Sequence, residues 1–260
     1  MIGGITMIAK LIAPAPKPEN YTRYLFIGPH PDDIEIGAGA TAVRLAAEGK
    51  EVHFLILTDG CYGSGALVEK TKEEVVAIRR AEAEKAAAII GAKSVTILSF
   101  SDGGMYKTED LAVEIAKVAS RFKPEVIFCP DHKLKTEGHA DHLKGGLAAS
   151  LAFVFMGNEL MMKDIGAEGI AEPKALAYYY TDKPNRFVKV SKYIKTQLTA
   201  LAEHKSQVEI DVGGGKSFHS MMKLYFTFRA IRFGVRSLKG KAEGFRVIAP
   251  IHSHCFAEKF

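Results

Sequence analysis

The sequence contains few cysteines. Only three occur in 260 residues, Cys61, Cys129 and Cys255, and they are too far apart to form a CxxC pair. An odd number of widely separated cysteines argues against a disulfide framework and fits a reducing compartment better. We therefore expect a cytoplasmic protein whose stability comes from a buried core.

Long apolar runs are also missing. No stretch approaches the roughly 20 consecutive apolar residues that a bilayer-spanning helix needs, so no membrane partner is expected. The first 16 residues are largely apolar, but Lys10 interrupts them and no basic region precedes them, which argues against a secretory signal. We interpret residues 1–22 as an N-terminal extension and residues 23–260 as one domain.

The chain has no concentrated block of positive charge. Its 35 lysines and arginines exceed its 30 acidic residues by five, and the basic residues are scattered along the sequence. Proteins that bind nucleic acids usually gather such residues on one segment or face, so no nucleic-acid partner is expected. A small excess of this kind suits an anionic or a neutral substrate equally well.

The sequence does contain a regular alternation of short apolar runs with longer stretches of helical periodicity. This alternation predicts an α/β fold: a Rossmann-like single domain with a mostly parallel sheet and helices on both faces. Thr71 and Glu74 have the spacing of a capping box, and residues 157–173 are expected to form a loop. The expected strands are 24–27, 52–57, 95–98, 126–129, 175–180, 186–190 and 245–248, and the expected helices are 36–49, 71–90, 111–122, 140–155, 193–204 and 218–233.

A dense polar cluster, Pro29-His30-Pro31-Asp32-Asp33, directly follows the first expected strand. A histidine and an aspartate three positions apart can meet on one side of a tight turn, and their nitrogen and oxygen donors suit a cation such as zinc. The second carboxylate can accept a proton from a water held by the metal. The alternative is structural, because Asp32 or Asp33 could simply cap the helix that follows.

A second cluster, His139-Ala140-Asp141-His142, follows the fourth expected strand and starts a helix. It offers a ligand, a proton donor and an orienting carboxylate, although a polar surface loop would have the same composition. Ligands of open parallel sheets bind at the carboxyl ends of the strands, so both clusters are expected to converge there. Together they predict a three-ligand metal site with one open position, as a catalytic zinc requires.

Two glycine-rich segments are expected to serve the fold rather than a cofactor. Gly37-Ala38-Gly39 lacks the strand–GxGxxG–helix placement of a dinucleotide site, so its small residues favour close helix packing instead. Residues 213–217, Gly-Gly-Gly-Lys-Ser, look like the end of a phosphate loop. Ile210 stands where that pattern needs glycine, so we expect a flexible loop.

Most of the chain, from about Tyr24 to His254, resembles the LmbE-like (PIG-L) family of zinc-dependent N-acetylglucosaminyl deacetylases. Within that family it is most similar to the archaeal diacetylchitobiose deacetylases. The His-Pro-Asp-Asp motif, followed by Ile34-Glu35-Ile36-Gly37, is highly specific for the family. The other matching segments are Thr58-Asp59-Gly60, Arg79-Arg80-Ala81-Glu82, Ile90-Gly91, residues 179–185, Gly234-Val235-Arg236 and Glu243-Gly244-Phe245-Arg246.

The resemblance implies a metal site and a reaction. His30, Asp33 and His142 would bind zinc, and Asp32 would be the general base. The implied reaction is removal of the acetyl group from an N-acetylglucosamine-containing sugar such as diacetylchitobiose, through a metal-activated water. The implied partners are a small amino-sugar substrate and further copies of the chain in a homo-oligomer, with a hexamer as the suggested form.

The resemblance also implies residues around the substrate. His139 matches the proton-donating histidine of the family, and Asp141 would tune it. We assign Arg79 and Asp102 to substrate binding. His254 matches a C-terminal histidine near the reacting carbonyl.

Three points are open at the level of the sequence. Ala140 replaces the proline of the family's usual His-Pro-Asp-His motif, which is expected to alter stiffness but not ligation. Arg80 and His252 are neighbours that could take the places of Arg79 and His254. Two other activities compete: a metal-dependent amidase of the same scaffold acting on another N-acyl glycoside (a thiol glycoside or an antibiotic precursor), and a non-catalytic sugar- or nucleotide-binding protein.

Overall fold

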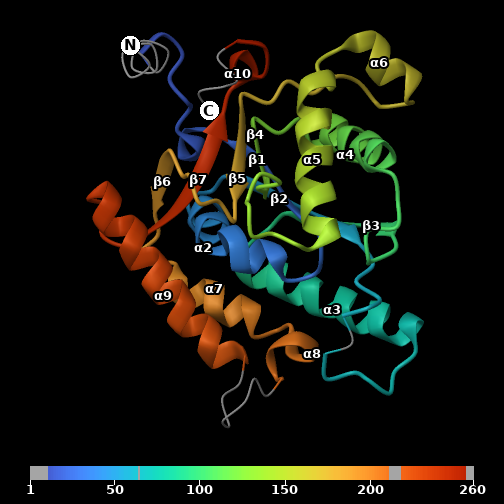
Figure 1. The fold of residues 1–260 in the computed structure, drawn as a ribbon, viewed down its shortest axis with the longest axis vertical. Coiled ribbons are helices and arrows are strands. Elements are labelled where there is room, and N and C mark those ends of the chain that lie inside the picture. Colours follow the sequence, from blue (N-terminus) through green and yellow to red (C-terminus); the bar gives the residue numbers. More distant parts are fainter. Residues whose placement is uncertain (1–10, 64, 211–217, 256–260) are drawn as a thin grey trace.

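A computed structural model describes residues 11–63, 65–210 and 218–255, which form a seven-stranded sheet flanked by helices (Figure 1). The strand order is β3-β2-β1-β4-β5-β7-β6. The five strands from β3 to β5 are parallel, whereas β7 runs antiparallel to both β5 and β6. This confirms the predicted Rossmann-like α/β fold. The strands are β1 (Arg23–Gly28), β2 (Glu51–Thr58), β3 (Ser94–Phe100), β4 (Val126–Pro130), β5 (Ala175–Tyr179), β6 (Arg186–Lys189) and β7 (Ala242–Ile248).

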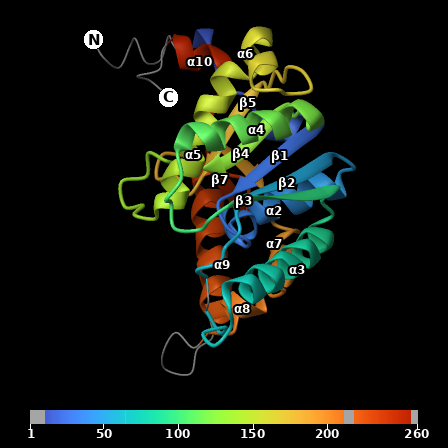
Figure 2. The same cartoon turned by 90° about the vertical axis from the view of Figure 1, so that its right-hand side faces the viewer.

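Helices cover both faces of the sheet, as Figure 2 shows. On one face lie α4 (Thr108–Phe122) and α5 (Ala140–Phe155). On the other lie α2 (Asp33–Ala47), α3 (Lys72–Ile90) and α7 (Ile194–Leu201), and α9 (Phe218–Ser237) packs beside β6 and β7. The short helices are η1 (Pro18–Asn20), α6 (Glu159–Asp164), α8 (Lys205–Val208) and α10 (Pro250–His254).

The central strand β1 explains why the strands of this sequence are continuous apolar runs. Tyr24 and Phe26 pack in the core beneath α2, whereas Leu25 and Ile27 pack in the core beneath α4 and α5. All four side chains are fully buried. A parallel strand covered on both faces has no solvent-facing side, so it shows no alternation of apolar and polar residues.

Local signals in the sequence place α2 and α3. The Thr71 side chain accepts a hydrogen bond from the backbone N–H of Glu74, whose carboxylate in turn accepts one from the backbone of Thr71. This is the predicted capping box, and Gly91, with a φ of 88°, ends the helix. On α2, a Cβ at Gly37 would overlap the ring of Tyr179, which confirms close packing as the reason for the small residues there.

Some elements differ from the prediction. Residues 157–173, expected to be a loop, contain α6, which Asn158 caps by accepting a hydrogen bond from the backbone N–H of Met161. Strand β7 starts at Ala242, three residues before the expected start. The predicted loop at residues 213–217 lies outside the described residues. Within the described part of the chain, no helix is long and apolar enough to cross a membrane.

Candidate functional site

The two polar clusters, residues 29–33 and 139–142, lie at the topological switch point of the sheet, where the strand order reverses. From β1 the sheet extends through β2 and β3 on one side and through β4 on the other. The helices that follow β1 and β4 lie on opposite faces, which leaves a crevice at the carboxyl ends of these two strands. Residues 29–33 follow β1, and residues 131–142 follow β4, so the structure brings both clusters to this crevice.

The first cluster folds into a tight turn around Asp33. The Asp33 Oδ2 accepts a hydrogen bond from the backbone N–H of His30 at 2.9 Å and lies 3.0 Å from Nδ1 of the His30 ring. The other carboxylate oxygen, Oδ1, lies 3.3 Å from Nε2 of His142. Asp33 therefore joins the two histidines, and the predicted set of His30, Asp33 and His142 forms one contiguous group.

Asp32 occupies the N-cap position of α2, but it does not act as a conventional cap. Its φ is 116°, in the left-handed region that a residue with a side chain rarely adopts, and its side chain makes no capping hydrogen bond within the described residues. Its carboxylate faces Arg79 instead, with 3.6 Å between Asp32 Oδ2 and the guanidinium Nη2. A backbone held in such a conformation is typical of functional sites.

The histidines of this group lie in negatively charged surroundings that carboxylates create. Burial favours the neutral ring of His30, but its contacts with Asp102, Asp141 and Asp33 raise its pKa to about 12. Burial also favours neutral His142, yet Asp33 and Glu137 raise the pKa of that ring to about 9. Because the site stabilises positive charge so strongly, a divalent cation can take the place of the protons.

The histidine ring atoms that do not face Asp33 also meet carboxylates. The Nδ1 of His142 lies 2.9 Å from Glu137 Oε2, and the Nε2 of His30 lies 3.3 Å from Asp102 Oδ1 and 3.4 Å from Asp141 Oδ2. Histidines that bind metals almost always pair their second ring nitrogen in this way, which fixes the orientation of the ring. The donor chemistry and the second contacts therefore both fit a metal centre.

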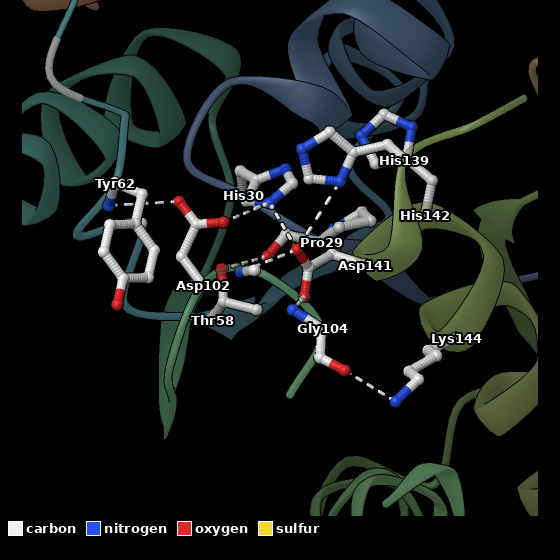
Figure 3. A network of polar contacts seen from close by, with 12 residues as sticks. Pro29, His30, Thr58, Tyr62, Asp102, Gly104, His139, Asp141, His142 and Lys144 are labelled. Carbon is white, nitrogen blue, oxygen red and sulfur yellow. Dashed lines mark hydrogen bonds and ion pairs between the residues drawn. The ribbon is translucent and has the colours of Figure 1, made fainter. Parts of the chain in front are cut away.

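Two overlapping groups of donor atoms satisfy the distances of a cation site. The donor atoms of His30, His139 and His142 lie within 4.8 Å of one another, as do those of His30, His139, Asp102 and Asp141. Figure 3 shows these three histidine rings gathered beside Asp102 and Asp141. The predicted ligand set shares His30 and His142 with the first group, to which Asp33 adds its carboxylate contacts.

Arg79, rather than its neighbour Arg80, reaches the site. The Arg79 side chain is buried and donates hydrogen bonds of 2.9 Å to the carbonyls of Gly60 and Pro31, whereas Arg80 is exposed. These bonds hold its guanidinium beside Asp32. Burial raises the pKa of Asp32 to about 6, although the positive charge of Arg79 opposes that rise.

Asp141 is the anchor of the loop between β3 and α4. Its fully buried carboxylate accepts hydrogen bonds from the backbone N–H groups of Gly103 and Gly104 at 2.9 and 3.0 Å, and from the Tyr106 hydroxyl at 2.7 Å. Its contact with Nδ1 of His139 is longer, at 3.5 Å. Asp141 thus fixes the loop that carries Asp102 as well as facing His139.

A polar cavity of about 290 Å³ opens over these groups. Asp102 lies in its wall, and His139 lies at the start of α5 with about half of its side chain exposed. Ala140, which replaces the family's proline, is the first residue of α5, a position that proline also favours. The lining consists of predicted residues and of three that the sequence did not single out: His30, Asp32, Asp33, Arg79, Asp102, His139 and His142, with Tyr62, Gly63 and Gln207.

The structure does not bring His254 to this cavity within one chain. Because β7 is antiparallel to β5, it ends at the amino edge of the parallel strands, and α10 follows at once. Figure 1 shows α10 at the top of the molecule, away from the lower end of α5 where that helix starts. His254 is exposed there, whereas its neighbour His252 is buried with Nε2 2.9 Å from the Ala13 carbonyl oxygen.

Glu137 is a residue beside the candidate site that the sequence analysis did not predict. Its carboxylate contacts the His142 ring and accepts a hydrogen bond from the backbone N–H of His139 at 2.8 Å. The available signal was an acidic residue two positions before a His-x-x-His segment.

Comparison with known proteins identifies similar sequences. The model of the family described as GlcNAc-PI de-N-acetylase (PIG-L) matches residues 25–153. The diacetylchitobiose deacetylase of Thermococcus kodakarensis is 34% identical over 240 residues, which cover 89% of this chain and 85% of the relative. A probable N-acetyl-alpha-D-glucosaminyl L-malate deacetylase 2 of Bacillus cereus is 30% identical over 192 residues, covering 71% and 83%.

A solved structure supports the same relationship in three dimensions. The N,N'-diacetylchitobiose deacetylase from Pyrococcus horikoshii, in complex with its inhibitor MPG, superposes with a TM-score of 0.85. The alignment covers 98% of this chain and 95% of that one, at 27% sequence identity. The likeness therefore includes the whole sheet and its helices.

Proposed function

Because the chain belongs to the PIG-L family of GlcNAc-PI de-N-acetylases, and is thus a deacetylase, we propose that it acts on diacetylchitobiose or a similar N-acetylglucosamine sugar. The product pair would be acetate and a free amino sugar. The similarity to two diacetylchitobiose deacetylases, along nearly the whole chain, supports this choice of substrate. The observation that carries the proposal is the group of Asp33, His30 and His142 at the switch point of the sheet.

We propose that His30, Asp33 and His142 hold a zinc ion. Two imidazoles and one carboxylate are a common ligand set for catalytic zinc, which keeps a further position open. A bound zinc ion would polarise the amide carbonyl and lower the pKa of a nearby water. Glu137 and Asp102 would keep the two rings oriented through their second nitrogens.

Asp32 is the proposed general base. Its carboxylate lines the cavity but pairs with Arg79 rather than with a histidine, so it can take a proton from the attacking water. The pKa of about 6 that burial gives it is close to that of an effective base near neutral pH. Arg79 holds this carboxylate in place and offers positive charge to the substrate.

His139 is the proposed proton donor. It lies beside His30, with 4.7 Å between the ring centroids, and lines the same cavity. An imidazolium at this position can protonate the departing amine, while Asp141 stabilises its positive charge. A carboxylate base and a histidine acid that line one cavity suit amide hydrolysis.

Acetate release tests the proposed function. The protein is incubated with chitooligosaccharides of defined length, with and without a chelator, and acetate and free amine are measured. Release from diacetylchitobiose, lost with the chelator and restored by zinc, is the expected result. Release only from other N-acyl glycosides would support a different amidase, and no release from any sugar would contradict the proposal.

We also propose that the enzyme is a homo-oligomer. Exposed apolar side chains lie on α5, at Leu147, Leu151 and Val154, and on α6, at Leu160 and Met161. The spacing of the three residues on α5 places them on one face of the helix, and an exposed apolar face of this kind is typical of a protein interface. If His254 serves a reacting carbonyl, it must do so in the cavity of another copy.

A further inference from the structure

A second, larger cavity of about 670 Å³ adjoins the polar one. His142 lines both cavities, and Tyr180 lines the larger one beside it. The Tyr180 ring stacks on the His142 ring, with centroids 5.8 Å apart and planes 11° from parallel. A ligand whose reacting group lies at the histidines can therefore continue past His142 into the larger cavity.

The wall that α9 contributes to this cavity is aromatic. Tyr225 and Phe228 line it and are 46% and 63% exposed, so both rings are accessible to a ligand, and the Arg229 guanidinium lies over one face of Tyr225, 5.1 Å from the ring centroid. Aromatic rings gain free energy when an apolar face covers them. The C–H face of a pyranose ring offers such a surface, while its edge of hydroxyl groups needs hydrogen-bond partners.

The polar groups of the cavity suit a neutral ligand. The charge of Arg229 is matched, because its guanidinium lies 3.6 Å from Glu243 and donates a hydrogen bond to the Ile36 carbonyl. The exposed rim then carries Arg232 and Asp182, which have opposite charges. These groups can donate to and accept from hydroxyls, but together they do not favour an anion. A few polar groups in a mostly apolar pocket are the usual means of orienting a small ligand.

We propose that this second cavity binds the sugar unit linked to the N-acetylated one, so that the enzyme prefers substrates of two or more units. The inference rests on the proposed function, because the first unit must lie with its acetamido group at the histidines. Tyr225 and Phe228 are specificity-determining residues in this arrangement, and they take no part in bond cleavage.

The test compares acetate release from N-acetylglucosamine with release from N,N'-diacetylchitobiose. We expect the Phe228→Ala variant to lose about tenfold in kcat/KM on the disaccharide, mainly through KM, as the loss of one stacked ring implies. Its activity on the monosaccharide is expected to stay within about twofold of wild type. Leu224→Ala is the matched control, because Leu224 is exposed on α9 outside the cavity.

The outcomes separate this inference from the proposed function. Equal losses on both sugars, or no loss on the disaccharide, would overturn the second sugar site while leaving the deacetylase activity established. If Phe228→Ala loses activity equally on both sugars and also forms a smaller oligomer, the exposed rings of α9 would contact a second copy of the chain instead of a sugar. Arg232→Gln provides a second variant should Phe228→Ala fail to fold. A wild type inactive on both sugars would refute the proposed substrate, and the inference with it.

Discussion

The carboxylate of Glu137 lies 2.9 Å from Nδ1 of His142, in the loop that precedes α5. The same carboxylate accepts the backbone N–H of His139 at 2.8 Å, so one side chain fixes both histidines of the His-x-x-His segment. Nε2 of His142 is thereby directed toward Asp33, 3.3 Å away. Orientation of a metal-binding ring by such a contact reduces the entropy lost when the ion binds.

Replacement of Glu137 is therefore expected to weaken metal binding before anything else. Glu137→Ala should lower zinc affinity by about 10–100-fold, the usual cost of losing such a contact. Glu137→Gln keeps an acceptor for Nδ1 and should lose less. The dissociation constant is measured by competition with a chromogenic chelator, with Glu109→Ala, an exposed glutamate on α4, as the control. Unchanged affinity in the alanine variant would contradict the role of Glu137.

The Asp32→Asn variant tests whether Asp32 acts as the general base without binding the metal. The amide keeps the size of the side chain but cannot take a proton, so turnover should fall by about 10²–10⁴-fold. Bound zinc should stay stoichiometric, since Asp32 faces Arg79 rather than the histidines. Turnover is followed by acetate release and metal content by elemental analysis, with Asp110→Asn on the surface as the control. Near-wild-type turnover would exclude Asp32 as the base.

The buried pair of Asp131 and Arg246 predicts a pH-dependent contribution to stability. Burial favours protonated Asp131, but hydrogen bonds from Arg246, one of 2.8 Å, lower the pKa of that carboxyl below its ordinary value. A lowered pKa stabilises the fold above the unfolded value of about 3.9, and this stabilisation disappears as the pH falls through the folded pKa. Asp131→Asn should therefore cost about 3–5 kcal/mol at pH 7 and progressively less below about pH 4.

Urea denaturation of wild type and Asp131→Asn at pH 7 and pH 3 measures that difference. Glu168→Gln is a suitable control, because Glu168 pairs with Arg121 on the surface and such pairs contribute little at either pH. A difference between wild type and Asp131→Asn that is the same at both pH values would show that the ionised carboxylate is not the source of the stabilisation.

The sequence predicted those parts of the fold that depend on neighbouring residues. Thr71 and Glu74 lie three positions apart, and the capping box they form is local. The direction of β7 could not be predicted from neighbouring residues. Its apolar pattern is the same whether the strand runs parallel or antiparallel to β5. The helix α6 was missed because six residues are too few to establish a helical period.

In the candidate site, too, contacts between neighbouring residues were predictable from the sequence and contacts that depend on the path of the chain were not. His30 and Asp33 meet within one turn, so their spacing was sufficient to predict the contact. The link between Glu137 and His142 depends on the path of an irregular loop, which no periodicity describes. His254 matched the family in sequence, but only the topology of β7 shows that it lies at the other edge of the sheet.

The position of His254 leads to a complementation experiment. The helix α5, which starts at the site and has α10 beside it, is 16 residues long and spans about 24 Å, too far for one side chain to bridge. If His254 acts in the cavity of another copy, each site draws Asp32 and His254 from different chains. His254→Ala and Asp32→Asn should both be poorly active alone. Co-expressed in equal amounts, they should recover about a quarter of wild-type activity, because one site in four then has both residues intact.

The control for this experiment pairs Asp32→Asn with Asp33→Asn, whose defects lie in the same cavity of one chain. Every site that such a mixture can form is defective, so no activity should return. The two variants of each mixture carry different affinity tags, and purification through both tags in turn isolates mixed oligomers before acetate release is compared. Mixed oligomers of the first pair that remain inactive would show that His254 does not reach a neighbouring site. In that case His254 would have no part in the reaction, and His139 and Arg79 would be the side chains that assist the proposed zinc ion at the carbonyl.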